Sequence, residues 1–294
     1  MQNALFYGCG TALVTPFHGN RVDFDALENL IDWQIDEGVN ALVILGTTGE
    51  PAAVTDSERT SVIECAVARA ARRVPVIVGT GSNDTRTAVR HTIEAQMLGA
   101  DAALVVTPYY NRCSQSGLIE HYTAIADQAE LPVYMYNVPG RTGVNLDPPT
   151  VAELARHPNL RAVKEASGNL RQMVDLAAAC GDGMALYCGN DDQVIPAMAL
   201  GARGVISVAG NVIPRQMHEM AMLWLQGEHD RALALQMHCL PLIRALFSDV
   251  NPIPVKCALH QMGLIGEKLR LPLTPLDAPK AEALARELKR CELI

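Results

Sequence analysis

The chain has 294 residues and a formal net charge of −8, with 49% hydrophobic and 19% charged residues. This balance is typical of a folded globular protein and excludes a disordered chain. The negative charge is not offset by a basic block, which argues against nucleic acid as a partner. No apolar run is long enough to cross a membrane, and no signal-peptide pattern opens the chain. We therefore expect neither a membrane nor a nucleic-acid partner.

The eight cysteines are scattered through the sequence and form no Cys-x-x-Cys pair. In a chain of this length, that distribution favours reduced thiols and a cytoplasmic location. The eight histidines are also dispersed and show no metal-binding spacing. The sequence accordingly predicts no metal site.

Short apolar segments alternate with segments of helical periodicity along the first two thirds of the chain. Such alternation predicts a parallel sheet with right-handed crossovers. Eight units suit an α/β fold of the (β/α)8 TIM-barrel type. The predicted strands are residues 10–14, 41–45, 76–79, 103–106, 133–136, 162–164, 185–188 and 205–207. The predicted helices between them are residues 24–37, 57–72, 86–98, 118–129, 170–179 and 192–200.

Local signals mark where several of these helices begin and end. Gly38, Gly99 and Gly201 stand just past helix ends, where glycine supplies a left-handed cap. Asp56 and Asp84 stand where N-cap residues are expected.

After residue 207 the pattern becomes purely helical. We assign residues 1–210 to the barrel that carries the active site, and residues 211–294 to a helical extension packed on it. The absence of a Gly/Ser-rich linker argues against a freely moving second domain. The predicted helices of the extension are residues 216–226, 230–247, 253–262 and 278–291.

Lys164 is the leading candidate for chemistry. It ends a short apolar strand, and the chain's other four lysines all lie in the extension. An ammonium group in such a place is costly unless it is paired or loses its proton. A neutral lysine amine can form a Schiff base with a carbonyl substrate. The alternative is an ordinary surface lysine at a strand end.

Other candidates follow from the rule that barrel enzymes build their sites at the carboxyl ends of the strands. The turn Gly46-Thr-Thr-Gly-Glu50 has backbone N–H groups that could bind an anion, although a plain turn is an equal alternative. Arg141 lies between glycines after another strand, where its planar fork suits a carboxylate. A surface salt bridge is the alternative for Arg141.

Tyrosines gather at the same predicted positions. Only seven occur in the chain, yet Tyr109, Tyr110 and Tyr136 all stand at strand ends. Each could instead be a packed side chain with one hydrogen bond. Together the candidates are an amine, phenols, a hydroxyl-rich turn and an arginine at one end of the barrel.

Four motifs resemble those of the dihydrodipicolinate synthase family. The lysine motif alone marks the wider group of pyruvate-dependent class I aldolases, and the combination is more specific. The resemblance extends over nearly the whole chain, including Asn251-Pro-Ile-Pro-Val-Lys256. The four motifs are Gly46-Thr-Thr-Gly-Glu50, Pro108-Tyr-Tyr-Asn-Arg112, Tyr136-Asn-Val-Pro-Gly-Arg-Thr-Gly143 and Val163-Lys-Glu-Ala-Ser-Gly-Asn169.

The resemblance implies a synthase that condenses pyruvate with L-aspartate 4-semialdehyde, the first committed step of the diaminopimelate and lysine pathway. Lys164 would form the Schiff base with pyruvate, without any further cofactor. Tyr136 would act as general acid and base. Thr47 and Tyr110 would complete a proton relay. Tyr110 would reach a neighbouring subunit's site, and the family suggests a homotetramer built as a dimer of dimers.

The resemblance also implies substrate-binding roles. The backbone of Thr47 and Thr48 would hold the pyruvate carboxylate, and Arg141 would hold the carboxylate of aspartate semialdehyde. The Ile206 carbonyl and Gly189 would line the pocket.

Feedback-inhibited members of the family carry a lysine-binding pocket, which Asn83 and Tyr109 match. Asp56, Arg59 and Thr87 stand where the lysine-sensitive form has histidines and a glutamate. Thr87 lacks the carboxylate that would pair with the ligand's ammonium group. We therefore expect weak or absent inhibition by lysine.

The sequence leaves two other hypotheses for the function of the chain. One is another pyruvate-dependent aldolase, such as an N-acetylneuraminate or 2-keto-3-deoxy-sugar acid lyase. Arg141 and Thr47 favour the synthase, because an arginine suits a short substrate with a second carboxylate. The other is a non-enzymatic barrel acting as a sensor or scaffold. Retention of the whole candidate site argues against it.

Overall fold

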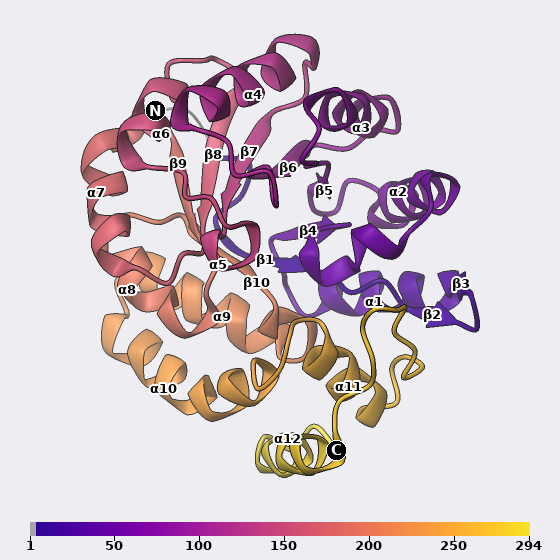
Figure 1. Ribbon diagram of the computed structural model, residues 1–294. Helices are drawn as coiled ribbons and strands as arrows, with labels where there is room; N and C mark the ends of the chain where they lie inside the picture. The colour runs from indigo at the N-terminus through magenta and orange to yellow at the C-terminus, as the bar shows by residue number, and fades with distance from the viewer. Residues whose placement is uncertain (1–3) are drawn as a thin grey trace.

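The computed structural model describes residues 4–294, and its centre is a closed barrel (Figure 1). Within this range eight parallel strands close the barrel in the order β1-β10-β9-β8-β7-β6-β5-β4. The predicted (β/α)8 fold is thus confirmed. The barrel strands are β1 (Gly8–Ala12), β4 (Ala41–Ile44), β5 (Val76–Gly79), β6 (Ala102–Val106), β7 (Val133–Asn137), β8 (Leu160–Glu165), β9 (Ala185–Cys188) and β10 (Gly204–Ser207).

Helices between the strands form the outer layer of the barrel (Figure 1). Their apolar sides pack on the strands, while a second, smaller cluster of buried side chains fills the barrel interior. The helices are α1 (Phe24–Asp36), α2 (Asp56–Ala70), α3 (Thr85–Met97), α4 (Gln115–Gln128), α5 (Pro139–Thr142), α6 (Pro148–Leu154), α7 (Leu170–Cys180) and α8 (Val194–Ala199). The sequence did not predict α5 or the small hairpin of β2 (Phe17–His18) and β3 (Arg21–Val22).

The predicted helix signals are confirmed with one exception. Gly38, Gly99 and Gly201 all have positive φ angles, and Asp84 caps α3 by accepting from the Thr87 N–H. The prediction for Asp56 was wrong, because Asp56 is the first helical residue of α2.

Thr55 is the actual cap of α2. Its hydroxyl accepts from the Glu58 N–H, and the Glu58 carboxylate accepts from the Thr55 N–H. This reciprocal pair satisfies two free donors at once, which a single Asp56 cap would not.

The barrel closes between its first and last strands through two glycines. Gly8 pairs with Gly204, and a Cβ added to Gly204 would lie 1.8 Å from the Gly8 carbonyl oxygen. Gly204 also has a φ of 156°, which side-chain-bearing residues rarely adopt. Strand β1 therefore begins at Gly8, two residues before the predicted start, where it pairs with Gly204.

The C-terminal part is helical, as predicted, and comprises α9 (Pro214–Leu225), α10 (His229–Leu246), α11 (Ile253–Gln261) and α12 (Ala278–Arg290). Helix α9 packs against β1 and β10, and α10 packs against α9 and α12. The division of the chain at residue 210 stays a prediction. In the part of the chain that the structure describes, no helix is both long and apolar enough to cross a membrane.

Candidate active site

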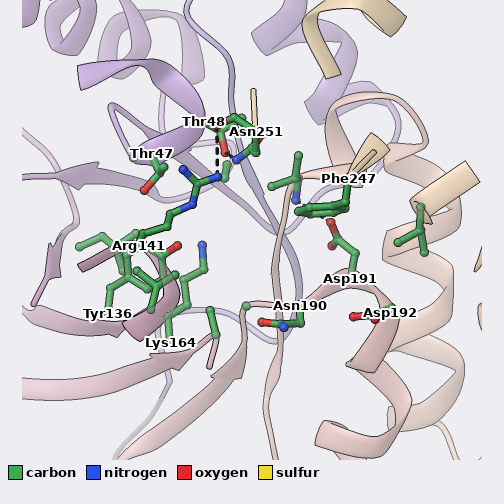
Figure 2. A pocket seen from close by; sticks show the side chains of 18 of the residues that line it. Thr47, Thr48, Tyr136, Arg141, Lys164, Asn190, Asp191, Asp192, Phe247 and Asn251 are labelled. Atoms are coloured by element: carbon green, nitrogen blue, oxygen red, sulfur yellow. Dashed lines mark hydrogen bonds between the residues drawn. The ribbon is translucent and has the colours of Figure 1, made fainter. Parts of the chain in front are cut away.

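A cavity of about 430 Å³ opens at the carboxyl ends of the barrel strands (Figure 2). Side chains from separate strands line it, because parallel strands bring all their carboxyl ends to one face. The lining includes Thr47, Thr48, Tyr136, Arg141, Lys164 and Gly189, together with residues of the C-terminal helical part.

Lys164 and Tyr136 face each other across two neighbouring strands. They are direct partners in the register of β7 and β8. The Lys164 ammonium nitrogen lies 4.3 Å from the centroid of the Tyr136 ring. Both residues are nearly buried, with 5% and 7% of their surface exposed. The amine and the phenol that we expected in one site are therefore in contact.

The next residues along these strands hold the pair in place from outside the barrel. The Asn137 amide donates to the Glu165 carboxylate at 2.9 Å, and the Gln172 amide donates to the same oxygen at 3.0 Å. Glu165 also accepts from the Ser167 N–H. Because successive side chains of a strand alternate in direction, this outer network keeps Tyr136 and Lys164 pointing inward.

Gly189 leaves room for the lysine side chain. A Cβ at this position would lie 3.1 Å from Lys164 Cε and 2.5 Å from the Ala166 Cβ. A side chain here would therefore displace Lys164 or Ala166. Position 189 therefore requires glycine, because the lysine side chain occupies the space that a Cβ would fill.

The turn after β4 carries Thr47 and Thr48 in a short 3-10 segment, Thr47–Gly49. Glu50 follows in the left-handed conformation, and its carboxylate lies 2.6 Å from the Lys256 ammonium on α11. The Lys256 ammonium also donates to the Thr15 carbonyl at 2.9 Å. Burial lowers the pKa of Lys256, and the neighbouring Glu50 opposes this shift. The buried ion pair between Glu50 and Lys256 thus holds the turn against α11.

Arg141 extends from α5 into the cavity, where Figure 2 shows its guanidinium on the same side as the Lys164 amine and Thr47. One guanidinium nitrogen donates to the Asn251 carbonyl at 3.2 Å. The Asn251 amide in turn donates to the Thr48 hydroxyl at 3.0 Å.

Two predicted site residues lie away from the cavity surface in this chain. Tyr110 is 89% exposed and points outward from the loop after β6, so it is not among the residues that line the cavity. Ile206 is fully buried in the barrel interior and belongs to the same cluster of buried side chains as Tyr136.

A second cavity of about 520 Å³ lies beside the first and shares Tyr136 and Arg141 with it. Tyr109, Arg59 and Thr87 line this second cavity, whereas Asn83 is not among its lining residues. Asn83 instead accepts a hydrogen bond from Asn111 through its carbonyl.

His91 also lines the second cavity, although no sequence pattern selected it. Burial, with the charge of nearby Arg59, lowers the pKa of His91 to about 4. His91 is therefore neutral near pH 7, while Arg59 carries a positive charge.

We also did not predict three further residues that line the first cavity, namely Asp191, Phe247 and Asn251. The Asp191 carboxylate accepts from the backbone N–H groups of Val208 and Ala209, immediately after β10. Burial raises the pKa of Asp191. A strand-end rule could have found Asp191, which follows β9. Phe247 and Asn251 come from the C-terminal helical part, where periodicity marks no strand end.

The fold and this site define a lysine-dependent enzyme, a Schiff-base-forming lyase of the class I aldolase type. A family model for the dihydrodipicolinate synthetase family matches residues 5–291. The chain belongs to this family.

Named relatives and solved structures match over nearly the full length. A 4-hydroxy-tetrahydrodipicolinate synthase of Alkaliphilus oremlandii is 48% identical over 290 residues, covering 99% of this chain and 100% of the relative. A dihydrodipicolinate synthase structure from Thermotoga maritima is 40% identical with a TM-score of 0.98, covering 99% of this chain and 100% of that one. A third, from Cyanidioschyzon merolae with lysine bound, is 38% identical with a TM-score of 0.96 and covers 99% and 100%.

Proposed function

We propose that this chain condenses pyruvate with L-aspartate 4-semialdehyde as a 4-hydroxy-tetrahydrodipicolinate synthase. The observation that carries the proposal is the contact between the Lys164 ammonium and the Tyr136 ring, 4.3 Å from nitrogen to centroid, beside a hydroxyl-rich turn. Full-length relatives named as this synthase support the assignment.

The reaction begins when the Lys164 ammonium gives up a proton to solvent and the resulting neutral amine attacks the ketone carbon of pyruvate. Loss of water gives a cationic imine, which makes the pyruvate methyl group acidic. Removal of one methyl proton gives an enamine, and its carbon bonds to the aldehyde carbon of aspartate semialdehyde. The amine of that substrate then attacks the imine carbon, closes the ring and releases Lys164. No cofactor takes part in these steps.

Protons move through hydroxyl groups near the amine. Tyr136 gives and takes protons at the carbinolamine and enamine stages. Thr47 and Tyr110 carry them to solvent. Tyr110 is 89% exposed on its own chain, and we propose, as the family resemblance implies, that its hydroxyl enters the site of a neighbouring copy. The working form is therefore a homo-oligomer, which we propose to be a dimer of dimers in the cytoplasm.

Two carboxylates define the substrate pair. The Thr47 and Thr48 turn binds the pyruvate carboxylate through backbone N–H groups and hydroxyls. Arg141 binds the carboxylate of the aldehyde substrate, since a planar guanidinium can donate two parallel hydrogen bonds. Gly189 and the Ile206 carbonyl complete the pocket wall.

The test is borohydride trapping with pyruvate, followed by peptide mass spectrometry. The expected result is a reduced pyruvate adduct on Lys164, absent from Lys164→Arg. A folded protein that gives no adduct on Lys164 would remove the whole Schiff-base assignment.

A second assay then separates the synthase from the sugar-acid lyases. With aspartate semialdehyde as acceptor, the synthase consumes both substrates and releases a cyclic product. Turnover only with sialic acid or a keto-deoxy-sugar acid would instead place the chain among the lyases.

A further inference from the structure

Asn251 lies where the helical C-terminal part meets both proposed carboxylate-binding groups. It is 7% exposed and lies two residues before Ile253, the first residue of α11. Its side-chain amide donates to the Thr48 hydroxyl at 3.0 Å, and its backbone carbonyl accepts from Arg141 at 3.2 Å. Figure 2 shows Asn251 close to both residues at the rim of the cavity.

The hydrogen bond from Asn251 to Thr48 determines where the Thr48 hydroxyl can point its own hydrogen. A threonine hydroxyl has one hydrogen to donate and two lone pairs to accept with. When its oxygen accepts from Asn251, its own hydrogen remains available for another acceptor. Thr48 lines the cavity and is only 2% exposed, so an acceptor inside the cavity is the natural partner. A carboxylate there would receive a charge-assisted hydrogen bond.

The contact with Arg141 restricts a flexible cation. A long guanidinium side chain pays rotamer entropy whenever it binds in one geometry. The hydrogen bond to the Asn251 carbonyl holds one end of the fork before any substrate arrives. The remaining N–H groups keep their direction toward the cavity.

Asn251 is itself held firmly by the same turn. Helix α11, which starts at Ile253, carries Lys256, and the Lys256 ammonium lies 2.6 Å from the Glu50 carboxylate. Lys256 is fully buried and its ammonium also lies 4.2 Å from the centroid of the Phe17 ring. The turn and the start of α11 are therefore connected at two points, Thr48 with Asn251 and Glu50 with Lys256.

We propose that Asn251 is a positioning residue that orients the Thr48 hydroxyl toward the keto-acid carboxylate and holds Arg141 for the second carboxylate. This inference rests on the proposed function. Its consequence is that a residue of the C-terminal helical part determines affinity for the keto acid without touching the reacting carbon.

The primary test is Asn251→Ala in the trapping assay, reading the pyruvate concentration that gives half-maximal adduct on Lys164. Loss of one oriented hydrogen bond predicts an increase of roughly tenfold. Because the backbone carbonyl remains, KM for the aldehyde substrate should stay within about twofold. Asn251→Asp keeps the side-chain volume but removes the donor, so it should raise the half-saturating pyruvate concentration at least as much.

A double-mutant cycle shows whether Asn251 acts through Thr48. On a Thr48→Val background there is no hydroxyl to orient, so Asn251→Ala should cause almost no further change. The matched control is Asn159→Ala, which removes the same side chain at the opposite end of the barrel. There the Asn159 amide donates to three backbone carbonyls, so Tm should fall while half-saturation by pyruvate stays unchanged.

The outcomes separate this proposal from the proposed function. No Lys164 adduct in the unaltered protein would mean that the proposed function fails. A normal adduct with equal half-saturation in the unaltered chain, Asn251→Ala and Asn251→Asp would overturn only the role of Asn251. Full additivity of Asn251→Ala with Thr48→Val would also overturn it.

Discussion

Tyr136 and Lys164 illustrate how single residues acquire their roles in this protein. Each is an ordinary side chain at a strand end, and the role that we propose for each depends on the position of the other. The strand register places them opposite one another, with the ammonium 4.3 Å from the ring centroid. A lysine count and a strand-end rule were enough to select Lys164. The family resemblance had already given Tyr136 an acid–base role in the same site, and the strand register shows that the two side chains are in contact.

Tyr136→Phe should lower kcat by roughly 10²- to 10⁴-fold, the usual contribution of a placed proton donor and acceptor. The ring that packs near Lys164 is retained, so the protein should stay folded. Steady-state kinetics and slow borohydride trapping on Lys164 would measure the effect.

Tyr134→Phe is the matched control for that change. Tyr134 is buried in the barrel interior two residues before Tyr136, and its hydroxyl accepts from the Leu5 N–H at 3.3 Å. Its loss should cost about 1 kcal/mol of stability and leave kcat unchanged. Equal kcat values for Tyr136→Phe and the unaltered chain would contradict the assigned role of Tyr136.

The second cavity leads to a prediction about regulation at the residue scale. Arg59 and neutral His91 line it, and Thr87 offers no carboxylate to an ammonium ligand. A cationic amino acid would meet a like charge from Arg59 there. We expect lysine to inhibit weakly or not at all. Initial rates across a lysine titration would measure this, and half-inhibition below one millimolar, taken as a rough threshold, would contradict it.

At the scale of elements, the barrel depends on how closely its strands approach each other. β1 and β10 meet through Gly8 and Gly204, so the closure tolerates no side chain at the second position. The sequence signals for helices are local, and most were read correctly. The capping of α2 was misread because Thr55 forms a reciprocal pair with Glu58, and Asp56 also fits a generic cap position.

Gly204→Ala should therefore be severely destabilising. Its Cβ would lie 1.8 Å from the Gly8 carbonyl oxygen, and its φ is 156°. We expect loss of several kcal/mol or failure to fold, seen by urea unfolding.

Gly201→Ala provides the comparison in the same connection. Gly201 also has a positive φ, 94°, but no atom lies within 4 Å of an added Cβ. The backbone cost alone should be roughly 1–2 kcal/mol. Equal losses for the two variants would show that backbone closeness at β1 and β10 is not the cause.

At the scale of the whole molecule, the C-terminal part is attached to the barrel by partly and fully buried polar contacts. Arg270 donates to the Glu58 carboxylate at 2.7 Å and 2.5 Å, and to the Ala53 and Asn20 carbonyls. Its guanidinium carbon also lies 4.2 Å from the Phe17 ring centroid. These contacts, with the pair of Lys256 and Glu50, join segments more than 200 residues apart in sequence.

This attachment predicts an acid-sensitive contribution to stability. The Arg270 guanidinium lowers the pKa of Glu58 from 4.5 to about 2. Because the folded pKa lies below the unfolded one, the contribution is fully present above about pH 4.5 and is lost as pH falls toward 2. Allowing for solvent screening, we expect roughly 1–2 kcal/mol.

Glu58→Gln should remove this contribution and flatten the stability profile between pH 4.5 and 2. Urea unfolding at several pH values would measure it. Glu228→Gln is the matched control, since that carboxylate forms a largely exposed pair with Arg231 on α10. Parallel profiles for Glu58→Gln and the unaltered chain would contradict the prediction.

The sequence by itself determined the alternation of strands and helices, the (β/α)8 barrel and the family, and it selected Lys164 as the candidate for chemistry. These depend on local periodicity, on turn residues and on short motifs that need no distant partner. Only the tertiary structure decided which residues of the C-terminal helices join the site around Lys164. It brought Asn251 and Lys256 from the C-terminal helices onto the turn after β4. It also left Tyr110 exposed on its own chain. Such contacts depend on packing between segments far apart in the chain, and no local pattern records them.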